Sequence, residues 1–208
     1  MRTATNIAPA VLLALALSGC FAEVEDQSIT YTHQIPVCDD GTNANDCTFQ
    51  GVQASPLELI VFNLRGGSTQ FTVDLGDQDF LKPKQEAGPV TLESTLTLNR
   101  ATLTMSDEST GASFEGIDEL RLHQLAEGTN CGVGPCIAPS CQEIATYDRA
   151  RDGQATTEVT LRGSSLNMIE LLQGGQLILC VVGRGTPPSV DWSADATLDM
   201  AVKLHGSF

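Results

Sequence analysis

Residues 90–105 read VTLESTLTLNRATLTM, and this stretch decides the fold class. From Val90 to Leu98 every second position except Ser94 is apolar, which is the period of a β-strand with one buried face. Leu103 and Met105 have the opposite parity. Because strand side chains alternate strictly between the two faces, the chain needs a bulge or a turn near 99–101 to keep its apolar side chains together.

The same alternation occurs in other parts of the chain. It predicts a strand over 29–35, a doubly buried strand over 57–64 with 71–75 as its hairpin partner, and a last strand over 197–204. Shorter strands are expected around 120–122, 144 and 159–161, and the continuous apolar run 176–182 indicates a central strand.

One helix is expected, over 167–173. Asn167 suits its N-cap, Glu170 lies three residues on as in a capping box, and Gly174 suits the C-terminal end. Many short strands with little helix favour an all-β fold. We therefore predict an antiparallel β-sandwich with one short helix.

The N-terminal segment has a different character. Leu17, Ser18, Gly19 and Cys20 follow an apolar run over 7–17 with a basic residue near the start. This run is about half the ~20 residues that span a bilayer, as in the h-region of a signal peptide. The segment resembles the signal peptide and lipobox of bacterial lipoproteins. The resemblance implies cleavage before Cys20 and acylation of its sulfur and new amino group.

The resemblance also implies a cellular location, and the chain divides into segments. Phe21, where an inner-membrane lipoprotein commonly has Asp, implies delivery to the outer membrane of a Gram-negative cell, facing the periplasm or the surface. We expect a signal peptide at 1–19, a lipidated acidic tether at 20–28 and one disulfide-stabilised domain at 29–208. Residues 38–88 are expected to form a loosely attached lobe of that domain.

Charge restricts the partners. The chain has 11 Lys and Arg against 26 Asp and Glu, a formal net charge of −15. Such a surface repels phosphate backbones, which argues against nucleic-acid binding. It also repels anionic lipid headgroups, so lipid rather than charge would hold the protein at a membrane.

Six cysteines remain besides Cys20. They are Cys38, Cys47, Cys131, Cys136, Cys141 and Cys180. An even number in an exported protein predicts three disulfides. Cys38 and Cys47 flank one polar turn and most simply pair with each other, while two of the next three pair and the third reaches Cys180. The alternative is a four-cysteine zinc site made of Cys131, Cys136, Cys141 and Cys180.

The polar turn between Cys38 and Cys47 is the best candidate for a metal site, with Ca²⁺ as the ion. Its oxygen-bearing side chains are Asp39, Asp40, Asn43, Asn45 and Asp46. The EF-hand pattern is missing, and Asn, Asp and Gly are ordinary turn residues, so a plain disulfide-closed turn is favoured. No metal and no cofactor are expected.

The search for catalytic residues is mostly negative. The sequence has no nucleophile elbow, zincin helix, P-loop or dinucleotide fingerprint. The acid pairs Asp118/Glu119 and Asp77/Asp79 are interpreted as solvated turns, and Trp192 as a core residue. Each of the three histidines is expected on a strand. They are His33, His123 and His205.

These observations predict a protein that does no covalent chemistry. The expected function is that of a membrane-anchored structural or interaction module of the bacterial cell envelope, with an envelope protein as partner. The alternatives are a lipoprotein that binds Ca²⁺, a small ligand or a glycan, and an envelope hydrolase.

Overall fold

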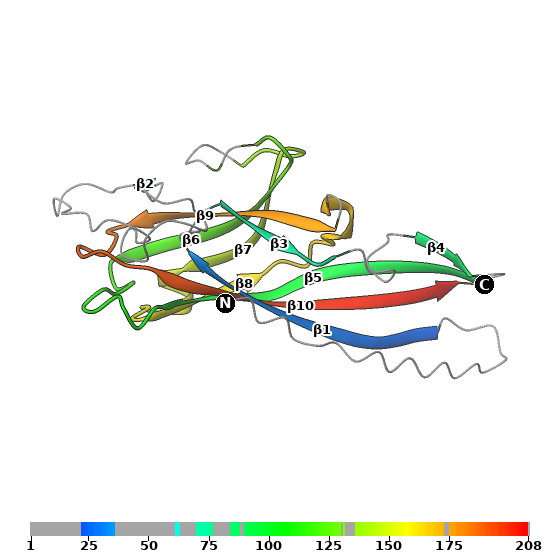
Figure 1. The fold of residues 1–208 in the computed structure, drawn as a ribbon, viewed down its shortest axis with the longest axis horizontal. Coiled ribbons are helices and arrows are strands. Elements are labelled where there is room, and N and C mark those ends of the chain that lie inside the picture. The colour runs from blue at the N-terminus through cyan, green and yellow to red at the C-terminus, as the bar shows by residue number, and fades with distance from the viewer. Residues whose placement is uncertain are drawn as a thin grey trace.

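The computed structural model describes residues 22–35, 61–62, 70–76, 84–87, 90–129, 131, 136–172 and 175–207. Nearly all regular structure in these residues is antiparallel β (Figure 1). The elements are β1 (Ala22–Ile35), β2 (Val61–Phe62), β3 (Gln70–Asp74), β4 (Lys84–Ala87), β5 (Val90–Met105), β6 (Ile117–Leu125), β7 (Cys141–Asp148), α1 (Arg149–Asp152), β8 (Glu158–Gly163), the 3-10 turn η3 (Ile169–Leu171), β9 (Gln176–Gly185) and β10 (Ala194–Ser207). Among the described residues, no helix is long and apolar enough to cross a membrane.

The strands form one sheet in the order β1-β10-β5-β8-β7-β6-β9-β2, with β3 also paired to β9 and β4 to β5. The sheet curls on itself, so its two edges approach each other: the Tyr31 hydroxyl on β1 donates to the Thr72 carbonyl on β3 over 3.5 Å. The predicted all-β antiparallel class is confirmed. The two halves of the sheet face each other across a common core and are continuous with each other, in a nearly barrel-like arrangement.

The predicted change of parity in β5 is a β-bulge. Leu98 lies opposite Met200 and Arg100 opposite Asp199, so Asn99 is the extra residue. Leu96 and Leu98 before the bulge and Leu103 after it are buried, which confirms the parity argument. Gly163 at the end of β8 lies against the bulge, where a Cβ would stand 1.7 Å from the Leu98 carbonyl oxygen.

The core is filled by the inward face of this curled sheet. β10 contributes Leu198, Met200 and Val202, all about fully buried. Trp192 precedes β10 and is 3 % exposed, with its ring edge-on to Phe114 at 5.7 Å between centroids. The prediction that Trp192 belongs to the core is therefore confirmed.

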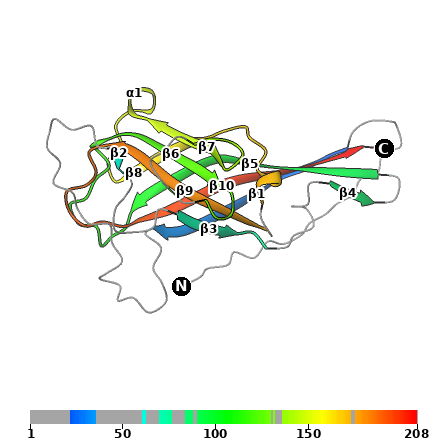
Figure 2. The ribbon, with the colours of Figure 1, turned by 90° about the horizontal axis from the view of Figure 1, so that it is seen from above.

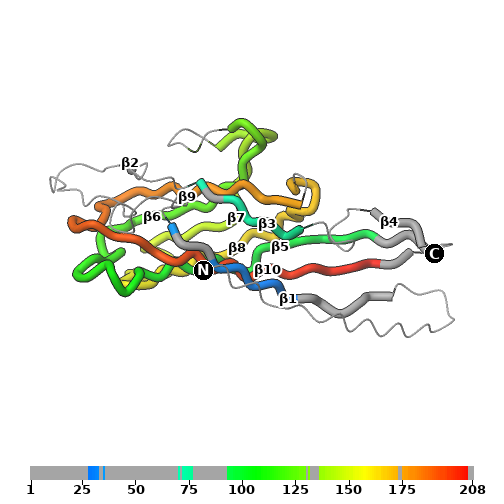
Figure 3. The backbone as a smooth tube through the Cα atoms, viewed as in Figure 1, coloured from blue at the N-terminus to red at the C-terminus, as the bar shows by residue number. Residues whose placement is uncertain are grey.

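Three long strands extend beyond the body of the sheet. β8 pairs with residues 100–104 of β5 only, whereas β10 follows β5 along its whole length. β5 and β10 therefore run on together as a projecting ribbon, with β1 on the free side of β10 (Figures 1 and 2). Figure 3 traces the paired course of β5 and β10 as tubes. Ala22 pairs with Gly206, so β1 starts at the tip of the ribbon.

This arrangement corrects the expected tether at 20–28. Residues 22–28 belong to β1 and pair with β10, with one register shift between Val24 and Gln27. The acidic stretch lacks clean alternation, and the strand forms because the long edge of β10 offers its backbone hydrogen-bonding partners.

The expected hairpin of 57–64 with 71–75 is also wrong in its pairing. β2 and β3 both pair with β9, β2 near Gly183 and β3 over 176–180, so they follow each other along one edge. Together with β4 they join the common sheet. The described strands within 38–88 thus belong to the common sheet. The rest of this range lies outside the described residues, so the loosely attached lobe stays a prediction.

Within the described part of the expected helix over 167–173, the structure has only the 3-10 turn η3, Ile169–Leu171. The Asn167 side chain does cap it, since its Oδ1 accepts from the Ile169 N–H at 3.1 Å. The turn ends because Leu172 is extended, with φ −65° and ψ 129°. The α-helical turn α1 has no counterpart in the sequence prediction; Asp148 caps it by accepting from the Ala150 N–H at 2.8 Å.

Candidate functional site

The segment that joins β6 to β7, residues 126–141 with Cys141 as the first residue of β7, is the cysteine loop. It carries two disulfides, Cys131–Cys180 and Cys136–Cys141. This confirms the prediction that two of the three loop cysteines pair and the third reaches Cys180. It also excludes the four-cysteine zinc site, because all four sulfurs are consumed in disulfide bonds.

Several other candidate residues lie outside the described residues. These are Cys20, Cys38, Cys47, Asp77, Asp79 and the calcium candidates Asp39, Asp40, Asn43, Asn45 and Asp46. The predicted lipidation, third disulfide and calcium turn therefore stay predictions.

The end of the cysteine loop is a tight, disulfide-closed turn. The Cys141 N–H and the Ser140 hydroxyl both donate to the Ile137 carbonyl, each at 3.1 Å, and the Ala138–Pro139 peptide is cis. This turn presents Ile137, which is 62 % exposed. The loop rises from the sheet as the yellow-green segment at the top of Figure 1.

His123 lies beneath this loop. It follows the exposed Arg121 by two residues on β6, and its register partners are Cys180 on β9 and Glu143 on β7. The side chain is nevertheless 4 % exposed. Its Nε2 has no hydrogen-bond partner among the described residues. A ligand nitrogen of His123 and the sulfurs of Cys136 and Cys141 all lie within 4.8 Å of one another.

Burial is the main influence on the His123 side chain. Desolvation lowers the pKa of His123 below its ordinary value of 6.5, and the positive charge of Arg121 lowers it further. The imidazole is therefore neutral at pH 7, with a lone pair on one ring nitrogen.

A broad pocket of about 830 Å³ opens beside the Cys136–Cys141 disulfide. Two side chains of opposite charge line this pocket, with Arg121 Nη1 at 3.3 Å from Glu143 Oε2. The lining residues come from β6, β7, the cysteine loop and the segment before η3. They are Arg121, Cys136, Ala138, Cys141, Gln142, Glu143, Ser164, Ser165, Leu166 and Asn167.

The carboxylates that the sequence singled out serve as ion-pair partners. Glu119 binds Arg121 and also lies 3.3 Å from Arg184 on β9, while Asp118 accepts from Arg149 at 3.0 Å. The hydrogen bond to Glu119 is the largest influence on Arg121 and raises its pKa. The acid pair thus lies on strand β6, not in the expected solvated turn: Glu119 joins the charged side chains of β6, β7 and β9, and Asp118 forms a separate ion pair with Arg149 of α1.

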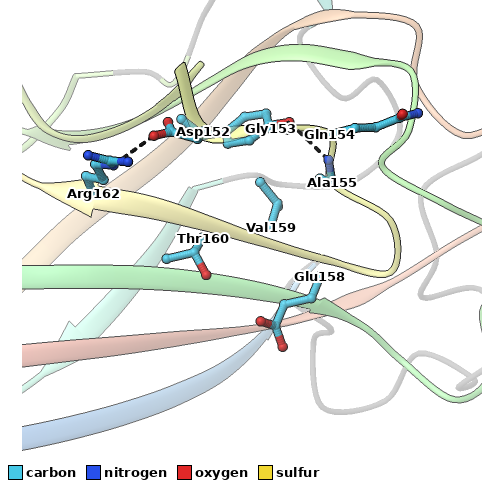
Figure 4. Close-up of a pocket in the computed structure, with 9 residues that line it drawn as sticks. Asp152, Gly153, Gln154, Ala155, Glu158, Val159, Thr160 and Arg162 are labelled. Atoms are coloured by element: carbon cyan, nitrogen blue, oxygen red, sulfur yellow. Dashed lines mark hydrogen bonds and ion pairs between the residues drawn. The ribbon is translucent and has the colours of Figure 1, made fainter. Parts of the chain in front are cut away.

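A smaller pocket of about 290 Å³ lies between α1 and β8 (Figure 4). Asp152 at its rim lies 2.7 Å from both Arg151 and Arg162. The Arg151 hydrogen bond, followed by the Asp148 N–H and the charges of Arg151 and Arg162, lowers the pKa of Asp152 to about 2, against the opposing effect of burial. Asp152 is therefore a permanent carboxylate at neutral pH and cannot serve as a general acid there.

The three histidines are on strands, as predicted, but they do not form one site. His33 pairs with Ala196 near the start of β10, whereas His205 lies near the end of that strand and is exposed. His123 is on β6, which is separated from β10 by three strands in the sheet order. The sequence does not predict that His123 lies between two disulfides, because this position depends on the register of β6 with β7 and β9.

Comparisons with known proteins give no family. No protein-family model matches the chain, and no curated protein matches it. Among solved structures, the chain is similar to the protein in the crystal structure of decameric BFDV capsid protein, with 12 % identity and a TM-score of 0.38 over 86 % of this chain and 98 % of that one. A likeness at this TM-score supports no conclusion about function.

Proposed function

We propose that this chain is a lipid-anchored, non-catalytic interaction module of the bacterial cell envelope, held by acylated Cys20. The body of the sheet presents the cysteine loop to an envelope protein. The one observation that carries the proposal is the disulfide-closed turn that displays Ile137 beside the pocket of about 830 Å³.

The turn has the properties of a binding element. A large apolar side chain on a short closed loop loses little conformational entropy on binding, so burial of Ile137 favours association directly. Arg121 and Glu143 at the adjacent pocket supply charges of both signs, which can fix the orientation of a partner.

The course of β1 supports the anchor part of the proposal. β1 begins at Ala22, and extended chain advances at most about 3.6 Å per residue, so a lipid on Cys20 would be tied close to the ribbon tip. The ribbon would then act as a stalk between the membrane and the body of the sheet. The negative charge of the protein favours the same arrangement, because it repels anionic headgroups.

The anchor is tested by replacing its acceptor. In Cys20→Ala we expect the protein to leave the membrane fraction of cells, because no diacylglycerol can be attached. Recovery of this variant in the membrane fraction at wild-type yield would contradict the anchor.

The interaction site is tested by site-specific photo-crosslinking in intact cells. A photoreactive residue at Ile137 should give one discrete adduct with another envelope protein, and the same residue at exposed Gln154, in the other pocket, should not. Equal labelling from both positions, no adduct from Ile137, or an adduct of twice the chain mass would each contradict the proposal.

A further inference from the structure

The cluster of His123, Cys136 and Cys141 contains an unexplained polar atom. A buried ring nitrogen without a partner costs about 1–3 kcal/mol, so native proteins rarely retain one without a use. The His123 Nε2 is such an atom, on a side chain that is more than nine-tenths buried. The groups close to His123 include two sulfurs, those of Cys136 and Cys141.

The two disulfides differ in their access to solvent. Cys131, Cys136 and Cys141 are all half-buried and Cys180 is fully buried, but only Cys136 and Cys141 line the pocket of about 830 Å³. Thiol–disulfide exchange needs a path for the attacking thiolate to a sulfur. A reductant that enters this pocket therefore reaches both sulfurs of Cys136–Cys141, whereas Cys131–Cys180 offers at most the Cys131 sulfur, from outside the pocket. We expect Cys136–Cys141 to be reduced first.

We infer that reduction of Cys136–Cys141 turns this cluster into a two-cysteine, one-histidine site for a thiophilic metal ion, with Zn²⁺ as the expected occupant. The reductant is a dithiol. Its thiolate attacks one sulfur, the other leaves as a thiolate, and closure of the reductant's own disulfide releases the second. Two electrons and two protons reach the protein, and metal binding then displaces the protons from both thiols.

The geometry suits such an ion. Zinc bonds to sulfur at about 2.3 Å and to imidazole nitrogen at about 2.0–2.1 Å, which places the ligand atoms of a tetrahedral site roughly 3.3–3.8 Å apart. The three candidate ligand atoms already lie within 4.8 Å of one another. Two thiolates and an imidazole favour Zn²⁺ over Mg²⁺ or Ca²⁺. The fourth position is left to water from the adjoining pocket.

The site is absent while the disulfide is closed, because neither sulfur is then an anionic ligand. The cysteine loop would thus bind metal only in a reducing environment or after contact with a dithiol protein. This property is independent of the lipid anchor and of the partner proposed above.

The order of reduction is the first test. The full chain is treated with graded amounts of a phosphine reductant, which adds no thiol ligand, and free cysteines are alkylated and mapped by mass spectrometry. Cys136 and Cys141 should be labelled before Cys131 and Cys180. Labelling of Cys131 and Cys180 first would overturn the inference.

Metal binding is then measured with Cd²⁺ as a probe, through the ultraviolet thiolate-to-cadmium absorption band. The mildly reduced chain should gain one equivalent of bound Cd²⁺ over the oxidised chain. A Cys136→Ser, Cys141→Ser double variant keeps every other cysteine and should lose that equivalent. Equal binding by this variant and the wild type would overturn the inference.

His123 is tested separately. His123→Gln should weaken Cd²⁺ binding by at least about tenfold, while His205→Gln, on the exposed face of β10, should leave it unchanged. If His123→Gln does not fold, X-ray absorption at the zinc edge of the reduced wild-type chain replaces it. Two sulfurs and at least one imidazole per Zn²⁺ are expected, and a shell without imidazole would overturn the inference.

Discussion

At the scale of single residues, Asn167 joins two parts of the fold. Its Oδ1 accepts from the Leu96 N–H at 2.9 Å and from the Ile169 N–H at 3.1 Å, while the Met168 N–H donates to the Leu96 carbonyl at 2.7 Å. The bonds to Leu96 satisfy its backbone N–H and carbonyl groups at the edge of β5, beyond the residues of β5 that pair with β8. The segment before η3 is not a strand, but it supplies hydrogen bonds to β5 where β8 no longer pairs with it.

Replacing this side chain should therefore destabilise the domain. Asn167→Ala leaves two part-buried N–H groups without their acceptor, at a cost of about 1–2 kcal/mol. Asn167→Asp keeps an acceptor oxygen and should lose less. Denaturant unfolding of the three proteins measures both differences, and equal stability of Asn167→Ala and wild type would contradict this role.

Asp152 should make stability depend on pH. Its folded pKa of about 2 lies below the ordinary value of 3.8, so its contribution is present above about pH 4 and is lost as pH falls through 2. The arginine partners are exposed, so the effect is small: Asp152→Asn should lower Tm by roughly 2 °C at pH 7.

Thermal melts from pH 7 down to 2.5 check this prediction. The difference between Asp152→Asn and wild type should shrink over the acid part of this range. Glu158→Gln, which removes an exposed carboxylate from the same pocket, is the control. A difference that stays constant with pH would show that charge on Asp152 is not the cause.

At the scale of elements, the sequence predicts those strands whose side chains alternate cleanly. β5 with its bulge and the central part of β10 follow from parity alone. The start of β1 and the pairing of β2 and β3 with β9 do not, because they depend on partners more than a hundred residues away. For the site, cysteine spacing predicts the disulfides of the loop, but only strand register brings His123 beneath them.

The bulge in β5 gives a direct test of this parity argument. Deleting Asn99 forces either Leu96 and Leu98 or Leu103 to the outer face of the sheet, at a cost of at least about 3 kcal/mol. Asn99→Ala keeps the extra residue at an exposed position and should be nearly neutral.

Near-ultraviolet circular dichroism from buried Trp192, with resistance to protease, compares the two variants. The deletion should lose both signals, and Asn99→Ala should keep both. A deletion variant as well packed as wild type would mean that parity does not determine how β5 sits in the sheet.

At the scale of the whole molecule, the fold is a curled sheet with a ribbon at one end and the cysteine loop on its outer face (Figure 1). Strand β1 starts at the ribbon tip, so attachment and recognition would occupy different parts of the protein. The Cys131–Cys180 disulfide ties the loop to β9, and the Cys131 N–H donates to Gln70 on β3 at 3.3 Å. These two bonds hold the loop against β9 and β3.

The most direct measurement is the intact mass of the N-terminal peptide of the protein purified from bacterial membranes. We expect the mature chain to begin at Cys20 and to carry diacylglycerol on its sulfur together with an acylated amino group. A membrane-derived chain that keeps residues before Cys20, or that carries an unmodified Cys20, would contradict this expectation.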